Sequence, residues 1–222
     1  MAATIAFRWF NKIETGEVIK DLLLHGWNST EAWRRLHGED GPLFSGAYRI
    51  SGKLFTGAYI IKSPDGKPKL RGVLDCIDEA LRRIPDMWPR WTTLQEAWAD
   101  LKTLPYLGGF MAYEIISDLR WTPVLSAAPD ILTWANAGPG CARGLGWVQE
   151  NNPQHFTCGP SDQRTMLELM REILAASRDA RYWPSDWPVW ELREVEHWAC
   201  EFDKYRRAEH GERLKRRFRS GG

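Results

Sequence analysis

The chain has 222 residues with a formal net charge of +1, so any surface for nucleic acid must come from local clustering of basic side chains rather than from an overall field. The four cysteines show no C-x-x-C spacing and the five histidines form no H-x-x-x-H pair, which argues against a zinc site and favours reduced thiols in a cytoplasm. No apolar run approaches about 18 residues and no apolar core follows the N-terminus, so neither a membrane span nor a signal peptide is expected.

Two helices are predicted in the N-terminal forty residues. An apolar stripe predicts the first over residues 4–24, with a break at Thr15-Gly16. The second covers residues 29–37, between an asparagine that suits a helix start and a glycine that suits a stop. Arg8 and Asn11 share one face of the first helix, and a solvated face is the plain interpretation of that spacing.

Residues 41–70 contain a repeated tetrapeptide motif instead of a helical pattern. Ser-Gly-Ala-Tyr at 45–48 is echoed by Thr-Gly-Ala-Tyr at 56–59, which predicts a short β-hairpin near residues 44–62 or an ordered loop. The basic patch that follows is either solvated or a phosphate-binding surface, and its predicted DNA contacts are Lys62, Lys67 and Lys69. The pattern G-x-x-x-x-G-K-[ST] does not occur anywhere, so the chain is not a P-loop kinase.

The sequence predicts a helix, a glycine turn and a second helix in the centre of the chain. A helix over residues 74–84 stops at Pro85, and Thr93 with Glu96 forms a capping box for the next helix. That helix leads into a glycine turn and then into residues 110–119, which contain no helix breaker. A helix that opens on glycines presents bare backbone N–H groups to a phosphate oxygen, so the predicted DNA contacts of this turn are Gly108 and Gly109.

Three carboxylates follow this turn. Glu114 and Asp118 are four residues apart and therefore lie on one helical face. They are either solvated or they converge on a ligand or a cation. Asp130 is either part of the same site or the N-cap of a helix that carries Trp134.

The C-terminal part predicts two further helices. One is capped by Ser161, and the other covers about residues 190–209. The connector at 183–188 is rigid because its tryptophans favour burial. On the last helix Glu196 and Asp203 lie beside the buried face, where they are either paired, with Arg193 or Lys204 as candidates, or functional. The expected organisation is a single domain over residues 1–210 with a basic tail at 211–222.

Two resemblances add to these patterns. Residues 104–112 resemble the hairpin of the helix-hairpin-helix DNA glycosylases, but Phe110 occupies the position of the lysine nucleophile, which argues against a lyase. The ordered stretches 7–15, 55–59, 109–145 and 192–205 resemble the helical domain of 5-hydroxymethyluracil DNA kinases, also called the alpha-glutamyl/putrescinyl thymine pyrophosphorylase or amino-acid:DNA transferase family.

This resemblance implies a mainly α, helix-hairpin-helix DNA glycosylase-like domain that works in a bacterial or phage-infected cell. It implies displacement of pyrophosphate from activated 5-hydroxymethyluracil in DNA by an amino acid or polyamine, with a separate DNA base kinase as a further partner. The open alternatives are a monofunctional glycosylase that excises a modified base, and a non-catalytic DNA-binding partner of a DNA base kinase. The resemblance implies no specific cofactor, and a divalent cation could bridge the carboxylates and pyrophosphate.

The resemblance also suggests which residues act. The predicted catalytic residues are Glu114, Asp118 and Asp130. The predicted substrate-binding residues are Arg8, Asn11, Tyr113, Asn136, Arg143 and Lys204, and the glycines Gly138 and Gly140 join the DNA contacts named above.

Overall fold

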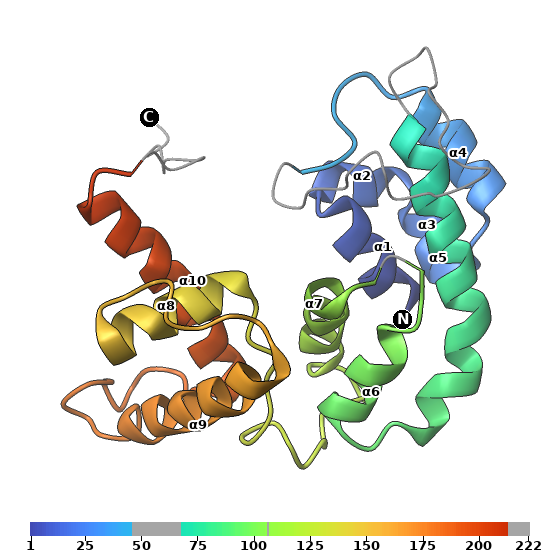
Figure 1. Cartoon of the computed structure of the whole chain (residues 1–222). Coiled ribbons are helices and arrows are strands. Elements are labelled where there is room, and N and C mark those ends of the chain that lie inside the picture. The colour runs from blue at the N-terminus through green and yellow to red at the C-terminus, as the bar shows by residue number, and fades with distance from the viewer. Residues whose placement is uncertain (46–67, 106, 213–222) are drawn as a thin grey trace. The chain divides into compact units, whose positions relative to one another are not determined.

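The structure, a computed structural model, describes residues 1–45, 68–105 and 107–212. Within these residues the chain is helical and contains no strand, which confirms the mainly α class. Contacts divide the chain into two compact units, Met1–Ala128 and Pro129–Gly222 (Figure 1). The expectation of a single domain over residues 1–210 stays a prediction, and each unit is described by itself below.

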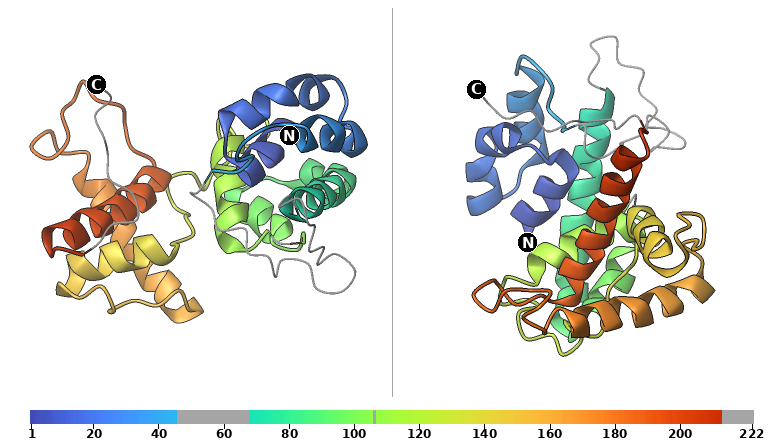
Figure 2. Two further views of the ribbon diagram at one scale, coloured as in Figure 1. Left: turned by 90° about the horizontal axis from the view of Figure 1, so that it is seen from above. Right: turned by 90° about the vertical axis from the view of Figure 1, so that its left-hand side faces the viewer.

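The first unit packs around its first helix. Helix α1 buries Ile5, Trp9 and Phe10, and it contacts α2, α3, α5 and α7. Helix α4 packs on α5, and α6 packs on α7; Figure 2 gives two further views of these helices. The elements of the unit are α1 (Ala2–Phe10), α2 (Ile13–Val18), α3 (Lys20–His25), α4 (Ser29–His37), α5 (Pro68–Met87), the 3₁₀ turn η1 (Trp88–Arg90), α6 (Leu94–Leu101) and α7 (Gly109–Leu119).

The predicted helix over residues 4–24 is wrong as a single element, because three short helices replace it. The main break lies at Asn11, whose φ of 47° and ψ of 42° are left-handed, and not at Thr15-Gly16. Asparagine tolerates this conformation better than most residues. Thr15 is instead inside α2, where its buried hydroxyl donates to the carbonyl oxygen of Leu43 at 2.7 Å.

The predicted starts of α4 and α6 are confirmed, and one predicted helix end is wrong. Helix α4 has the predicted bounds, with the Asn28 side chain accepting from the backbone N–H of Glu31. The capping box of Thr93 and Glu96 is present at the start of α6. The predicted stop at Pro85 is wrong, since α5 continues to Met87. A proline in the last turn of a long helix removes only one backbone hydrogen bond there, and the chain then tightens into η1.

Helix α7 begins where the glycine turn predicts. Gly108 is its N-cap, no side chain caps it, and the indole N–H of Trp98 on α6 donates to the carbonyl oxygen of Gly109 at 2.9 Å. The order of helix, turn and helix is therefore as expected, while the helix-hairpin-helix geometry and the glycosylase-like fold stay predictions. The predicted β-hairpin near residues 44–62 lies, apart from its first two residues, outside the described residues.

The second unit consists of α8 (Pro139–Glu150), α9 (Pro160–Ala176) and α10 (Leu192–Glu209). Helices α8 and α10 approach very closely along Gly140 and Gly144. A Cβ atom on Gly144 would lie 1.9 Å from the carbonyl oxygen of Ala199, and one on Gly140 would lie 2.4 Å from the sulfur of Cys200. Only glycine at position 144 permits this packing, whereas a Cβ on Gly140 would require the Cys200 side chain to move.

Three expectations for the second unit are corrected. Helix α9 begins with Pro160 after an N-cap at Gly159, so Ser161 is not its cap, because proline suits the first helical position. Trp187 is 52% exposed rather than buried. Residues 129–133 form turns, so Asp130 is not a helix N-cap; its carbonyl oxygen accepts from the backbone N–H of Trp134 at 2.8 Å.

None of the helices in the described ranges combines the length and the apolar composition that crossing a bilayer requires.

Candidate functional site

The first unit brings three of the predicted site residues together. Arg8 lies near the end of α1, and Glu114 and Asp118 lie one turn apart on α7, which packs against α1. The Arg8 guanidinium donates from Nε to Asp118 Oδ2 at 2.7 Å and from Nη2 to Asp118 Oδ1 at 2.6 Å. Its Nη1 donates to Glu114 Oε2 at 2.5 Å. One arginine therefore holds both carboxylates in fixed positions.

The three side chains of this cluster carry a formal charge of −1 between them. The Arg8 and Glu114 side chains are only 11% and 9% exposed, whereas Asp118 is 33% exposed. The repulsion expected of like charges four residues apart on a helix is offset by the shared guanidinium, which binds Asp118 in the bidentate manner. Asp118 is the member of the cluster that a ligand can reach.

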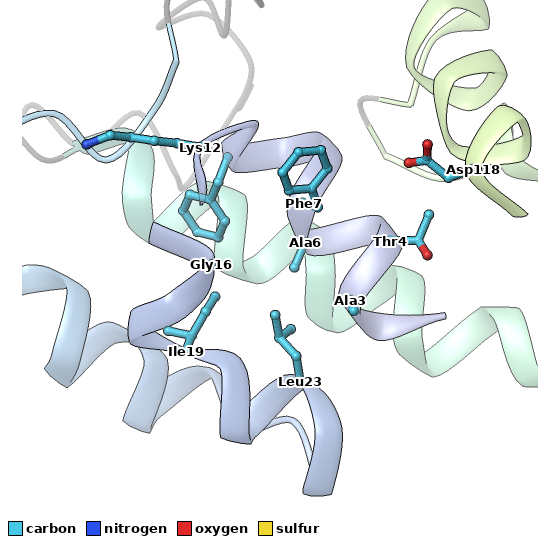
Figure 3. Close-up of a pocket in the computed structure, with 10 residues that line it drawn as sticks. Ala3, Thr4, Ala6, Phe7, Lys12, Gly16, Ile19, Leu23 and Asp118 are labelled. Carbon is cyan, nitrogen blue, oxygen red and sulfur yellow. The ribbon is translucent and has the colours of Figure 1, made fainter. Parts of the chain in front are cut away.

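Asp118 also borders a pocket of about 440 Å³ formed by α1, α2 and α3 (Figure 3). Apolar side chains make most of the wall, and Figure 3 shows Asp118 and Thr4 on one side of it with the Phe7 ring nearby. Lys12 contributes its stem, because its ammonium donates to the carbonyl oxygen of Pro42 at 2.6 Å and points away from Asp118 in Figure 3. The lining includes Ala3, Thr4, Phe7, Leu23 and Asp118.

The other predicted residues of the first unit have different surroundings. Asn11 donates through its side-chain amide to the hydroxyl of Ser45 at 3.0 Å. Tyr113 is 3% exposed, and its carbonyl oxygen accepts from the Ser117 hydroxyl. Gly108 is exposed at the start of α7. Of the predicted lysines, Lys69 lies in α5, and Lys62 and Lys67 are outside the described residues.

In the second unit the predicted residues take part in helix packing. Arg143 donates from Nε to Asp203 Oδ1 at 3.0 Å, and the Trp147 indole N–H donates to the same oxygen at 3.2 Å. Asp203 is 3% exposed, so the paired interpretation is correct for it, but the partner is Arg143 rather than Arg193 or Lys204. Lys204 pairs instead with Glu201.

The glycines before and inside α8 are also engaged. The backbone N–H of Gly138 donates to Glu196 Oε1 at 3.4 Å, which places a buried carboxylate at the N-terminus of α8, where the helix dipole favours it. Gly140 packs on Cys200. These contacts give both glycines a packing role, and contact with DNA stays a prediction for them.

Asp130 and Asn136 precede α8 in the second unit, and both are half-buried. The expectation that residues of both units line one cleft stays a prediction, as do the catalytic and binding roles assigned to them.

Comparison with known proteins gives one clear assignment. The family described as "5-hmdU DNA kinase, helical domain" matches residues 2–215, which is nearly the whole chain. The chain belongs to this family. The match confirms the resemblance found in the ordered motifs.

One relative of this helical-domain family is a protein named 5-hmdU DNA kinase from Bacillus phage SP10. It is 23% identical over 222 positions, which cover 91% of this chain and 33% of the phage protein. The chain thus spans about a third of the length of that relative. No solved structure matches the chain.

The described part of this helical domain contains no group of three or more His, Cys, Asp or Glu side chains arranged to hold a metal ion. Glu114 and Asp118, the pair expected to be available to a divalent cation, both bind the Arg8 guanidinium. The Arg8 guanidinium therefore already serves both carboxylates as a cation.

Sequence reasoning missed the pocket beside Asp118. Its lining comes from three short helices that a single predicted helix over residues 4–24 cannot form. No sequence pattern indicated the pocket, because the exposure of Phe7, at 40% beside buried Ile5, Trp9 and Phe10, arises only in the folded chain.

Proposed function

We propose that this domain modifies 5-hydroxymethyluracil in DNA by replacing an activated group on the base with an amine. The substrate is 5-pyrophosphoryloxymethyluracil in DNA, and the incoming group is an amino acid or a polyamine. The observation that carries the proposal is the cluster of Arg8, Glu114 and Asp118, in which one guanidinium fixes two carboxylates at the edge of an open pocket. Membership of the helical-domain family supports the choice of base, since the relative from phage SP10 is named for 5-hmdU.

The reaction is a substitution at the methylene carbon attached to C5 of the base. The amine nitrogen supplies the electron pair of the new C–N bond, the C–O bond to pyrophosphate breaks, and pyrophosphate leaves with the electrons of that bond. The resulting ammonium then loses one proton to a carboxylate or to water. Positive charge builds up first on the methylene carbon and then on the nitrogen.

A fixed negative charge suits both of these stages. Because Arg8 fixes the carboxylates before the reaction begins, they can stabilise the developing positive charge without reorganising. Asp118 is the most exposed member of the cluster and is the candidate for direct contact with the substrate. Glu114, at 9% exposure, contributes charge from behind it. Roles for Asp130, Asn136 and Arg143 belong to the same proposal.

DNA contact is assigned to the start of α7 and to the predicted basic residues. The helix begins at an exposed glycine with no side-chain cap, so its first N–H groups suit a phosphate oxygen. The proposed site of action is the cytoplasm of a bacterial or phage-infected cell, where the modified DNA is present.

The deciding experiment incubates the full chain with DNA that contains 5-pyrophosphoryloxymethyluracil and with a mixture of amino acids and polyamines. The DNA is then digested and its nucleosides are resolved by mass spectrometry. A nucleoside whose mass corresponds to an amine on the C5 methylene, in place of pyrophosphate, supports the proposal. An abasic site would instead identify a glycosylase, and unchanged DNA would exclude both activities.

Two variants sharpen the result. Asp118→Asn keeps the shape of the side chain and removes its charge, so the proposal expects a loss of about 10²-fold or more in the rate of transfer. Asp21→Asn is the matched control, because this carboxylate also pairs with an arginine, Arg35, but is 56% exposed and lines no part of the pocket. Equal rates for the two variants would remove Asp118 from the mechanism.

A second candidate function is favoured by one observation. The relative from phage SP10 is named as a kinase and this sequence lacks the P-loop pattern, which fits a DNA-binding partner of a DNA base kinase. This function predicts that the chain increases the rate at which such a kinase phosphorylates 5-hydroxymethyluracil DNA, while leaving the pyrophosphorylated DNA unchanged by itself.

A further inference from the structure

We propose that the pocket beside Asp118 is the binding site for the uracil-type base after it has turned out of the DNA stack, and that Asp118 selects this base over cytosine. This inference rests on the proposed function and adds a location and a basis of specificity to it.

The size and lining of the pocket fit a pyrimidine. Its volume of about 440 Å³ lies within the range of about 300–1,000 Å³ typical of small-molecule sites. The wall is mainly apolar, with Ala3 and Leu23 on one side in Figure 3 and the Phe7 ring on the other. Enzymes that act on a single base extrude it into such a pocket and hold it between apolar and aromatic side chains.

Phe7 is the candidate stacking residue. It is a large apolar side chain that is 40% exposed, although the other large apolar residues of its helix, Ile5, Trp9 and Phe10, are buried. Exposure of this ring costs free energy in the unliganded protein, and a base stacked on it would cover the ring again. Stacking of a base on an aromatic side chain contributes about 1–3 kcal/mol.

The edge of the base would meet Asp118. Each carboxylate oxygen of Asp118 accepts one hydrogen bond from Arg8, at 2.7 Å and 2.6 Å. A carboxylate offers about four lone-pair positions, so further positions stay available on a side chain that is 33% exposed. An ionised carboxylate can only accept hydrogen bonds, and Arg8 fixes the direction in which it does so.

This property distinguishes the two pyrimidines. Uracil carries an N–H donor at N3, which matches a carboxylate acceptor, whereas cytosine carries a lone pair at N3, which the carboxylate repels. The hydroxyl of Thr4, beside Asp118 in Figure 3, can donate to a neighbouring carbonyl oxygen of uracil. A pocket of this design therefore prefers uracil-type bases.

A short aliphatic amine is the competing occupant, because its ammonium would also bind Asp118. The apolar wall favours the base, since a base can stack its whole face on the Phe7 ring, whereas the second ammonium of a diamine would lose its hydration against mainly apolar side chains. The experiment below treats the amine as an outcome that overturns the assignment.

The test compares two DNA oligonucleotides that differ in a single base, 5-hydroxymethyluracil or 5-hydroxymethylcytosine. Each modified base is placed opposite an abasic site, so that neither loses a pairing partner when it is extruded, and 2-aminopurine is the neighbouring base. Fluorescence anisotropy gives the affinity of the full chain for each DNA, and 2-aminopurine fluorescence reports unstacking. The expected preference for the uracil-type DNA is about tenfold, because one well-placed edge contact discriminates by about 1–3 kcal/mol.

Three variants assign the effect. Phe7→Ala should lower affinity and 2-aminopurine fluorescence with the uracil-type DNA, and Phe7→Tyr should restore both. Asp118→Asn should abolish the preference, because an amide can donate to N3 of cytosine. The preference is a ratio of two affinities, so a partly unfolded sample does not change it. Ile13→Ala is the control, since Ile13 is 71% exposed and lines no part of the pocket.

Retained preference in Asp118→Asn, or unchanged unstacking in Phe7→Ala, would overturn the assignment. So would saturation-transfer NMR in which 1,4-diaminobutane, rather than the modified DNA, receives magnetisation from the ring protons of Phe7. The two proposals fail separately. Transfer activity that survives Phe7→Ala rejects this pocket and keeps the function, whereas base-selective binding without any transfer rejects the function and keeps the pocket.

Discussion

Replacement of Arg8 by methionine tests how much the cluster of Arg8, Glu114 and Asp118 contributes to the stability of the first unit. Methionine keeps much of the length and apolar packing of the arginine stem but removes the guanidinium. Glu114 and Asp118, four residues apart on α7, would then lose the guanidinium that both of them bind. We expect Arg8→Met to destabilise the fold chiefly through the loss of this shared cation.

The size of the effect follows from the burial of the two carboxylates. Removal of one partner from a buried ion pair costs about 3–5 kcal/mol, because the other charge is left without compensation. Glu114 is 9% exposed and meets this condition, whereas Asp118 is 33% exposed and recovers part of its hydration. The lower end of the range, about 3 kcal/mol, is therefore the expected loss at neutral pH.

The measurement is urea unfolding followed by far-ultraviolet circular dichroism. The triple variant Arg8→Met, Glu114→Gln, Asp118→Asn removes the unpaired charges as well and should recover at least about 1 kcal/mol of the loss, since contacting residues in one network are not additive. The control is Arg34→Met, which breaks an ion pair whose arginine is 71% exposed and should cost less than about 1 kcal/mol. The reasoning is refuted if Arg8→Met costs no more than this control, or if neutral carboxylates do not lessen its cost.

Three further predictions concern helix packing, helix capping and charge. Gly144→Ala should cost about 3 kcal/mol or more in urea unfolding, because the new Cβ would lie 1.9 Å from the backbone oxygen of Ala199; Gly16→Ala, with open space around the new Cβ, should be neutral or stabilising, and equal costs would contradict the close packing. Gly108→Asp should raise stability slightly through N-capping yet weaken DNA binding relative to Gly108→Asn, which caps without charge; equal affinities of the two variants in a salt titration would argue against a phosphate at this helix start. The pKa of the Glu31 carboxyl is lowered from 4.5 to about 2 by hydrogen bonds from its two neighbouring arginines, so the stability that this pairing contributes is complete above about pH 4.5 and is lost as the pH falls toward 2; an NMR titration that finds an ordinary pKa would show that the pairing does not persist in solution.

Local rules recovered much of the helical framework. A capping residue and a glycine stop predict both ends of the helix at 29–37, and two residues three positions apart predict the capping box of Thr93. Such signals act within about one helical turn, so a linear sequence contains all the partners that they need. The same rules ended one helix too early, because they treat proline as a helix stop, whereas α5 continues through Pro85 to Met87.

The order of motifs along the chain was also sufficient to recognise the helical-domain family, which the match over residues 2–215 confirms. Motif order is a property of the chain alone and requires no knowledge of how its parts fold together. The sequence could likewise place Glu114 and Asp118 on one face of a helix, because an interval of four residues determines this.

The partners of those carboxylates were decided by tertiary structure alone. Arg8 is separated from Glu114 by 106 positions and from Asp118 by 110, and Arg143 is separated from Asp203 by 60. No periodicity or capping rule acts over such distances, so pairing depends on which helices pack together and at what rotation. The close approach of α8 and α10 at Gly144 illustrates the same point. The glycine can be seen in the sequence, but the backbone that packs against it belongs to Ala199, which is 55 residues away. Secondary structure and family were thus determined by neighbouring residues and their order, whereas the geometry of the candidate site arises from contacts that only the folded chain creates.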